Sequence, residues 1–125
     1  MKLLSKRHIL MLHHDLIQNY GGTEGMRDEN LLDSAINSPL QSFDGTGLYP
    51  SLFEKAARLG FGLIKNHPML DGNKRLGAHS MLTFLNINGV ILKWTQEDLI
   101  NITLAIASGE KQYEDLLQWI ISHQS

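Results

Sequence analysis

The chain has 125 residues, enough for one folded domain, and we expect residues 1–125 to form a single domain. It has no cysteine, which excludes a disulfide framework, a thiolate zinc site and a cysteine nucleophile. The formal net charge of −2 does not indicate nucleic-acid binding, and no signal peptide or membrane-spanning stretch is recognisable, so we expect a cytoplasmic protein with no nucleic-acid or membrane partner.

The first 40 residues predict two helices. Apolar residues recur every three or four positions over residues 9–20, and Ser5 is a suitable N-cap for that helix. Asp28 is the expected N-cap of a shorter second helix, which Pro39 prevents from continuing. For Arg27 we expect a local salt bridge or a part in this cap.

The middle of the chain predicts a loop or short hairpin over residues 41–49, followed by two central helices. The first begins at Pro50 or Ser51 and runs to about residue 66. Its apolar positions extend almost all round, which predicts a buried helix. The second central helix covers about residues 74–88.

Two more helices complete the expected fold. Residues 95–98 resemble a capping box, and the helix that they begin ends near Gly109. The last helix places five apolar residues on one face: Tyr113, Leu116, Leu117, Ile120 and Ile121. Because no convincing pair of strands appears, we predict an all-α fold with a functional loop between the two central helices.

That loop, within His67–Arg75, concentrates polar and charged residues between two of the most apolar segments of the chain. Lys74 and Arg75 fall in the first helical turn, where the helix dipole disfavours each cation by ~0.3–1 kcal/mol unless an anion is bound. Gly72 lets the backbone approach a ligand closely, and the N–H groups that follow it are unpaired at a helix start. The pattern predicts a phosphate site.

Two other residues of this loop suggest what happens to the phosphate. Asp71 offers a hard oxygen ligand, and one carboxylate with phosphate oxygens and waters is a typical Mg²⁺ site. His67 could accept a proton from an attacking hydroxyl. A base, a magnesium ligand and a phosphate cradle together suit transfer from a nucleoside triphosphate to a hydroxyl.

Each of these residues also has an ordinary structural interpretation. Asp71 or Asn73 could cap the following helix, and His67 could contact the last carbonyls of the preceding one. Lys74 and Arg75 could form a solvated face. These alternatives are weaker together than singly, because all of them would have to hold in one gap between buried helices.

The histidines outside the loop carry less weight. His79, one turn after Arg75, could approach the site, but surface or core roles are favoured for it. The same holds for the remaining four: His8, His13, His14 and His123.

The stretch His67–Arg75 resembles the signature of the Fic/Doc family, His-x-Phe-x-(Asp/Glu/Asn)-(Gly/Ala)-Asn-(Gly/Lys)-Arg. Met69 replaces the usual Phe, a buried anchor whose role a flexible hydrophobe can fill. The resemblance covers most of the chain and is closest to the death-on-curing (Doc) toxins. It implies a compact Fic/Doc-like helical bundle, in which a flap at about residues 40–49 presents the target segment.

The resemblance also implies roles for the motif residues in an ATP-dependent transferase. His67 would be the base, Asp71 the magnesium ligand, and Arg75 a further catalytic residue. The phosphates of ATP would be held by four residues: Gly72, Asn73, Lys74 and Arg75.

Two positions favour the Doc type over adenylyltransferases of the Fic type. The latter usually have Gly where this chain has Lys74, and a second Arg where it has Ala78. A Doc-like toxin would phosphorylate a Ser or Thr of a translation factor, elongation factor Tu for the Doc type. It would be restrained by a separate antitoxin, since no inhibitory helix is recognisable within the chain. The alternatives are AMP transfer and a non-catalytic module that binds nucleotide or antitoxin, against which the intact His67 and Asp71 argue.

Overall fold

Helices dominate residues 1–124, the part of the chain that the computed structural model describes, and they confirm the predicted all-α class. The elements in chain order are α1 (Lys6–Tyr20), α2 (Glu29–Asn37), the 3₁₀ helix η1 (Ser38–Leu40), β1 (Ser42–Phe43), β2 (Thr46–Gly47), α3 (Leu52–Asn66), α4 (Asn73–Ile87), α5 (Gln96–Ser108) and α6 (Tyr113–Ser122). The two strands form an antiparallel hairpin, one of the two structures predicted for residues 41–49.

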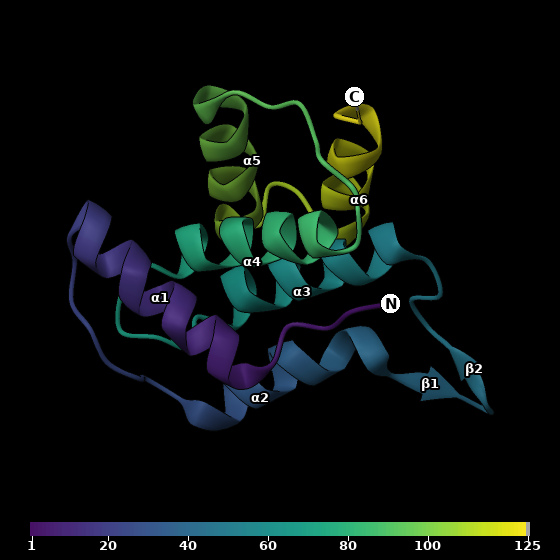
Figure 1. The fold of residues 1–125 in the computed structure, drawn as a ribbon, viewed down its shortest axis with the longest axis horizontal. Coiled ribbons are helices and arrows are strands. Elements are labelled where there is room, and N and C mark those ends of the chain that lie inside the picture. The colour runs from purple at the N-terminus through teal and green to yellow at the C-terminus, as the bar shows by residue number, and fades with distance from the viewer. Residues whose placement is uncertain (125) are drawn as a thin grey trace.

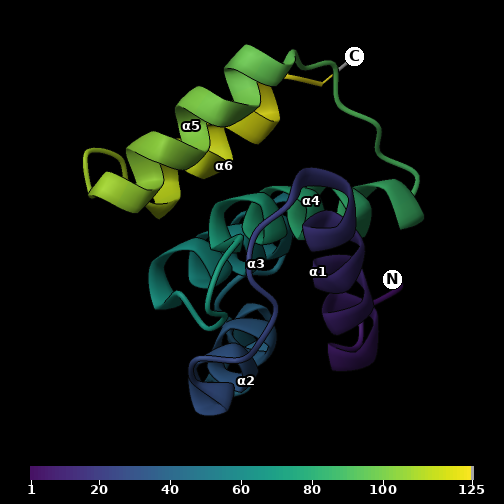
Figure 2. The ribbon, with the colours of Figure 1, turned by 90° about the vertical axis from the view of Figure 1, so that its left-hand side faces the viewer.

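The two central helices, α3 and α4, lie side by side and form the most extensive contact between elements (Figures 1 and 2). α1 packs against α4, and α2 packs against α3. α5 and α6 form a second layer over the central pair, and the hairpin projects away from it (Figure 1). This arrangement leaves the start of α4 between α1 and α5.

Small residues let α3 and α4 approach closely. A Cβ atom added to Gly77 of α4 would lie 2.5 Å from Cγ1 of Ile64 and 2.9 Å from the carbonyl oxygen of Gly60, both on α3. Any larger residue at position 77 would therefore push the two helices apart. Since the motif loop joins them, their tight contact also fixes where this loop begins and ends.

Local capping explains most helix starts. Ser5, Asp28 and Thr95 accept hydrogen bonds from the first turns of α1, α2 and α5, as predicted. Ser51 forms a capping box with Glu54 at the start of α3.

The expected face of the last helix is partly wrong. Leu116 and Ile120 are buried, but Ile121 is 43% exposed. α6 rests on α3 and α5 through a narrow stripe, and residue 121 is turned about 100° from residue 120 around the helix axis. None of the helices in residues 1–124 has the length and hydropathy that crossing a bilayer requires.

Candidate active site

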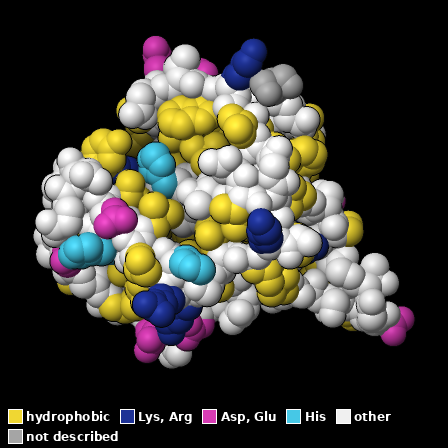
Figure 3. All heavy atoms as spheres, viewed as in Figure 1, with side chains coloured by type: hydrophobic (Ala, Val, Ile, Leu, Met, Phe, Trp, Pro, Cys, Tyr) yellow, Lys and Arg dark blue, Asp and Glu magenta, His cyan; other side chains and the backbone are white. Residues whose placement is uncertain are grey.

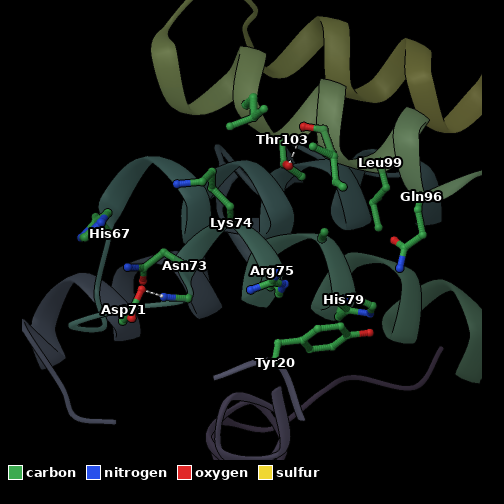
Figure 4. Close-up of a pocket in the computed structure, with 14 residues that line it drawn as sticks. Tyr20, His67, Asp71, Asn73, Lys74, Arg75, His79, Gln96, Leu99 and Thr103 are labelled. Atoms are coloured by element: carbon green, nitrogen blue, oxygen red, sulfur yellow. Dashed lines mark hydrogen bonds between the residues drawn. The ribbon is translucent and has the colours of Figure 1, made fainter. Parts of the chain in front are cut away.

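The predicted site residues lie around one pocket of about 430 Å³ (Figure 4). It lies between the start of α4, the end of α1 and one side of α5. His67 stands at one end of the pocket, and Gln96 and His79 lie towards the other (Figure 4). All six predicted residues line it: His67, Asp71, Gly72, Asn73, Lys74 and Arg75.

His67 is placed by the way in which α3 ends. The helix stops at Asn66, and His67 takes the left-handed conformation, with φ 51° and ψ 54°. This conformation costs a residue other than glycine roughly 1–2 kcal/mol. The turn directs the chain away from the axis of α3 and leaves His67 exposed at the pocket.

Arg27 closes the C-terminal end of α3. Its Nε donates to the carbonyl oxygen of His67 at 2.6 Å, and one of its terminal nitrogens donates to that of Asn66 at 2.8 Å. Pro68 has no N–H that could bond back to the helix, so these carbonyls need an outside donor. The expectation of a local role for Arg27 is therefore wrong, because its partners lie about 40 residues further along the chain.

The segment over residues 21–28, which we call the N-terminal connector, pairs with the motif loop. Arg27 N–H donates to the carbonyl oxygen of Pro68 at 2.8 Å, and Leu70 N–H donates to that of Gly25 at 3.0 Å. Between them, Met26 and Met69 form an antiparallel bridge. These contacts fix the first half of the loop from outside.

Asn73 fixes the loop from inside. Its side-chain oxygen accepts from Met69 N–H at 2.9 Å, and its side-chain nitrogen donates to the Met69 carbonyl oxygen at 3.0 Å. Asn73 is 4% exposed and Met69 is 3% exposed, so Met69 does fill a buried anchor position. Both ends of the Asn73 amide are thus turned to Met69, while its backbone N–H, in the first turn of α4, makes no hydrogen bond to any described residue.

The Asp71 carboxylate is exposed and held by two backbone N–H groups. Thr23 donates to Oδ2 at 3.0 Å and Gly72 donates to Oδ1 at 2.8 Å. These bonds, that from Thr23 first, lower the pKa of Asp71 below its ordinary value of 3.8. The carboxylate is therefore ionised at neutral pH, while its backbone carbonyl oxygen lies 2.8 Å from Nε2 of the buried His13.

The start of α4 combines unpaired donors with positive charge. Its N-cap is Gly72, which has no side chain to cap the helix. Within residues 1–124, the N–H groups of Asn73, Lys74 and Arg75 make no hydrogen bond, and the latter two side chains are exposed. The Arg75 guanidinium lies over the ring of Tyr20 from α1, 4.6 Å from its centroid. An anion bound here would meet three N–H groups and two cations.

The far end of the pocket contains His79, for which a surface or core role was favoured. His79 lines the pocket and is half-buried. Burial, and then the charge of Arg75, lower the pKa of His79 below 6.5, which favours the neutral imidazole. The opposite wall is the apolar side of α5, with Leu99, Ile100 and Leu104.

The motif and its surroundings agree with comparisons to known proteins. The model of the Fic/DOC family matches residues 3–85, which include the whole motif. The chain belongs to this family. A curated relative, "Toxin Doc" from Mycolicibacterium smegmatis, is 45% identical over 73 residues, which are 58% of this chain and 56% of the relative. The match thus spans little more than half the length of the relative. Membership of the Fic/DOC family agrees with the resemblance of the motif and with the helical fold.

Proposed function

We propose that this protein is a Doc-like toxin that transfers the γ-phosphate of ATP to a Ser or Thr hydroxyl of a translation factor, of the elongation factor Tu class. The observation that carries the proposal is the convergence of the motif residues on one pocket beside an uncapped, cationic helix start. A volume of about 430 Å³ falls within the range of small-molecule sites. We treat residues 1–125 as a single domain that carries out this reaction.

In the proposed reaction, His67 accepts the proton of the target hydroxyl. The hydroxyl oxygen forms a bond to the γ-phosphorus, the bond between this phosphorus and the β–γ bridging oxygen breaks, and ADP leaves. Lys74, Arg75 and the N–H groups of the first turn of α4 stabilise the negative charge on the phosphoryl oxygens. The backbone donors are fixed before the nucleotide arrives, because the loop is held by its own hydrogen bonds.

The residues present fit a magnesium ion that arrives with the nucleotide. Within residues 1–124, no group of three or more His, Asp or Glu side chains is placed to hold a metal by itself. Mg²⁺ is commonly bound by one or two carboxylates together with phosphate oxygens and water. Asp71 is an exposed, ionised carboxylate in the pocket and would be the protein ligand. The ion would neutralise part of the phosphate charge.

Ala78 favours γ-phosphate transfer over AMP transfer. It is 3% exposed and lines the pocket at the position where Fic-type enzymes usually carry a second arginine. Without that cation, the pocket holds fewer positive charges for the distal part of a triphosphate. We therefore expect the γ-phosphate to lie beside His67 and Lys74.

The relative named "Toxin Doc" supports the proposal that this chain is also a toxin, which a separate antitoxin restrains. The rim of the pocket offers the antitoxin an apolar surface, since Ile100 is 53% and Leu104 is 50% exposed on α5. Hydrophobic side chains gather over this region (Figure 3). An amphipathic helix of the antitoxin would suit it. Expression of the chain alone should arrest growth of its host, and harmless accumulation of soluble protein would contradict the toxin assignment.

The test of the reaction uses purified elongation factor Tu and ATP labelled at either the α- or the γ-phosphate. We expect label on the target from γ-labelled ATP only, and transfer slowed by roughly 10²–10⁴ in a folded His67→Asn variant. Label from α-labelled ATP only would make the protein an adenylyltransferase. Nucleotide binding without transfer to any translation factor would favour the non-catalytic module.

A further inference from the structure

His13 is a buried polar residue on an otherwise apolar face of α1. It is 3% exposed, and its neighbours on that face, Ile9, Leu16 and Ile17, are buried as well. Buried polar side chains in folded proteins almost always have a partner. The partner here is the Asp71 carbonyl oxygen, 2.8 Å from Nε2 of His13. Because a carbonyl oxygen only accepts, Nε2 must carry a proton and donate it.

This hydrogen bond acts on one particular peptide group. The carbonyl of Asp71 and the N–H of Gly72 belong to the same trans peptide, so they point in opposite directions. His13 holds the oxygen on the side of α1. The N–H on the other side donates to Oδ1 of the Asp71 carboxylate at 2.8 Å.

Gly72 makes the orientation of this peptide easy to lose. Its φ is +77°, and glycine also adopts negative φ at little cost, so the change of φ that a rotation of this peptide by about 180° requires is cheap at Gly72. The rotation would turn the carbonyl oxygen towards the carboxylate and the start of α4. An oxygen dipole would then face the Asp71 carboxylate in place of the N–H group that donates to it, beside the unpaired N–H groups at the start of α4.

We propose that His13 is a positioning residue that keeps the N–H of the Asp71–Gly72 peptide, and not its carbonyl oxygen, directed at the Asp71 carboxylate and the start of α4. Close packing supports this role. A Cβ atom at Gly72 would lie 3.6 Å from Nε2 of His13 and 3.3 Å from Cδ1 of Ile17, so the loop rests directly on α1. The consequence for nucleotide binding rests on the proposed function, whereas the orientation of the peptide does not.

Two substitutions of similar shape separate the hydrogen bond from the packing. His13→Gln keeps an N–H donor at the end of the side chain, and His13→Met has nearly the same length and shape without a donor. Ile9→Val, one turn earlier on the same buried face, controls for a general loss of α1 packing. Each variant is measured without ligand for thermal unfolding and for the amide resonance of Gly72, and then for Mg·ATP affinity.

We expect His13→Met and His13→Gln to unfold at similar temperatures, because the greater apolar burial of Met offsets the hydrogen bond that it loses. His13→Met should nevertheless shift the Gly72 amide resonance and weaken Mg·ATP binding by about tenfold, the usual effect of losing one buried hydrogen bond. His13→Gln and Ile9→Val should keep the affinity close to that of the wild type. Both His13 variants lose the ring-current effect of the imidazole on Gly72, so the Gly72 resonance is compared between them, and it should differ.

Two results would overturn the proposal. One is the same Gly72 resonance in His13→Met and His13→Gln, and the other is an equal loss of Mg·ATP affinity in these two variants. If the wild-type protein itself does not bind Mg·ATP, the proposed function fails, but the Gly72 resonance still decides whether His13 fixes the peptide.

Discussion

Two of the short connections between neighbouring helices lead to helix starts of opposite kinds. The connection over residues 109–112 leads into α6, whose first turn carries Glu114 and Asp115. The Asp115 carboxylate accepts a hydrogen bond from the N–H of Gln112 at 2.8 Å. Both acidic side chains also complement the positive end of the helix dipole. The start of α6 is thus satisfied by its own residues.

The connection over residues 67–72 leads into α4, where residues of the helix itself satisfy neither the first N–H groups nor the positive end of the dipole. Gly72 offers no capping side chain, and the first turn carries Lys74 and Arg75 where α6 carries acids. The start of α6 is stabilised by its own residues. The start of α4 lacks this stabilisation, as the proposed phosphate site requires, because a bound anion would supply it.

The largest effect should come from His67, the residue that ends α3 on the pocket side. We expect His67→Asn to lower the transfer rate by roughly 10²–10⁴, as removal of a general base typically does. Asn tolerates the left-handed conformation of residue 67, so the fold and Mg·ATP affinity should change little. Steady-state transfer of γ-label and calorimetric titration with Mg·ATP would measure the two quantities.

A matched control is His123→Asn, at the end of α6 and outside the pocket, which should leave the rate unchanged. Turnover of a folded His67→Asn protein within a few-fold of the wild type would remove His67 from the role of base.

Exchanging charges between the two helix starts should produce the next largest effect. Lys74→Glu should weaken Mg·ATP binding by about tenfold or more, since it removes a charge-assisted contact and adds repulsion. The same change should raise the stability of the ligand-free protein by ~0.3–1 kcal/mol, because it suits the dipole of α4. Glu114→Lys should lower stability by a similar ~0.3–1 kcal/mol and leave the affinity unchanged.

Urea denaturation and calorimetry on both variants measure these opposite responses. If Lys74→Glu leaves the affinity intact, Lys74 belongs to a solvated face, and the contrast between the two helix starts has no functional meaning.

The ends of the preceding helices offer a third, smaller test. α5 ends with backbone donors, since Gly109 N–H bonds to the carbonyl oxygen of Ile106 at 3.1 Å. α3 relies on Arg27 instead, because Pro68 cannot donate. Arg27→Met should therefore cost about 1 kcal/mol of stability and lower the transfer rate several-fold through a less ordered His67. Arg7→Met, which removes an exposed arginine from α1, is the control for lost charge. Equal behaviour of the two variants in thermal unfolding and transfer assays would show that Arg27 does not hold the loop.

The sequence predicted those features that depend on neighbouring residues. Caps such as Ser5, Asp28 and Thr95 act within three or four positions, so the helix starts followed from local pattern. The predicted site residues likewise lie within one loop and one helical turn, so their proximity followed from the sequence. The structure brings all of them to one pocket.

The supporting contacts could not be predicted, because they join residues that lie far apart in the chain. Arg27 reaches a carbonyl 40 positions away, and His13 reaches one 58 positions away. A histidine on an apolar helix face did signal a buried partner, but the partner is a backbone carbonyl that any residue carries. Asn73 was expected to hold a phosphate, and only the folded loop shows that its side-chain amide turns back to Met69.

The smallest predicted effect concerns His79, at the far end of the α4 pocket. Burial, and then Arg75, lower its pKa below 6.5 in the folded protein. On unfolding the pKa returns to about 6.5, so the unfolded chain binds a proton before the folded one as the pH falls. The neutral imidazole therefore contributes stability above this pH, and the contribution is lost as the pH falls through the lower, folded pKa. His79→Gln should reduce the loss of stability between pH 7 and pH 5, measured as urea midpoints, whereas His8→Gln on the exposed side of α1 should not.

Asp71 cannot produce the same slope, because its lowered pKa keeps it ionised throughout this range. Bound nucleotide provides a second test of His79. Its phosphates offset the charge of Arg75 and favour the protonated imidazole of His79. With saturating Mg·ATP, wild-type protein should thus lose less stability in acid than ligand-free protein, beyond the uniform gain that binding gives. Nucleotide adds no negative charge at the start of α6, where Glu114 and Asp115 already supply it. If wild type and His79→Gln lose equal stability between pH 7 and pH 5, then folding does not lower the pKa of His79, and Arg75 does not act on it.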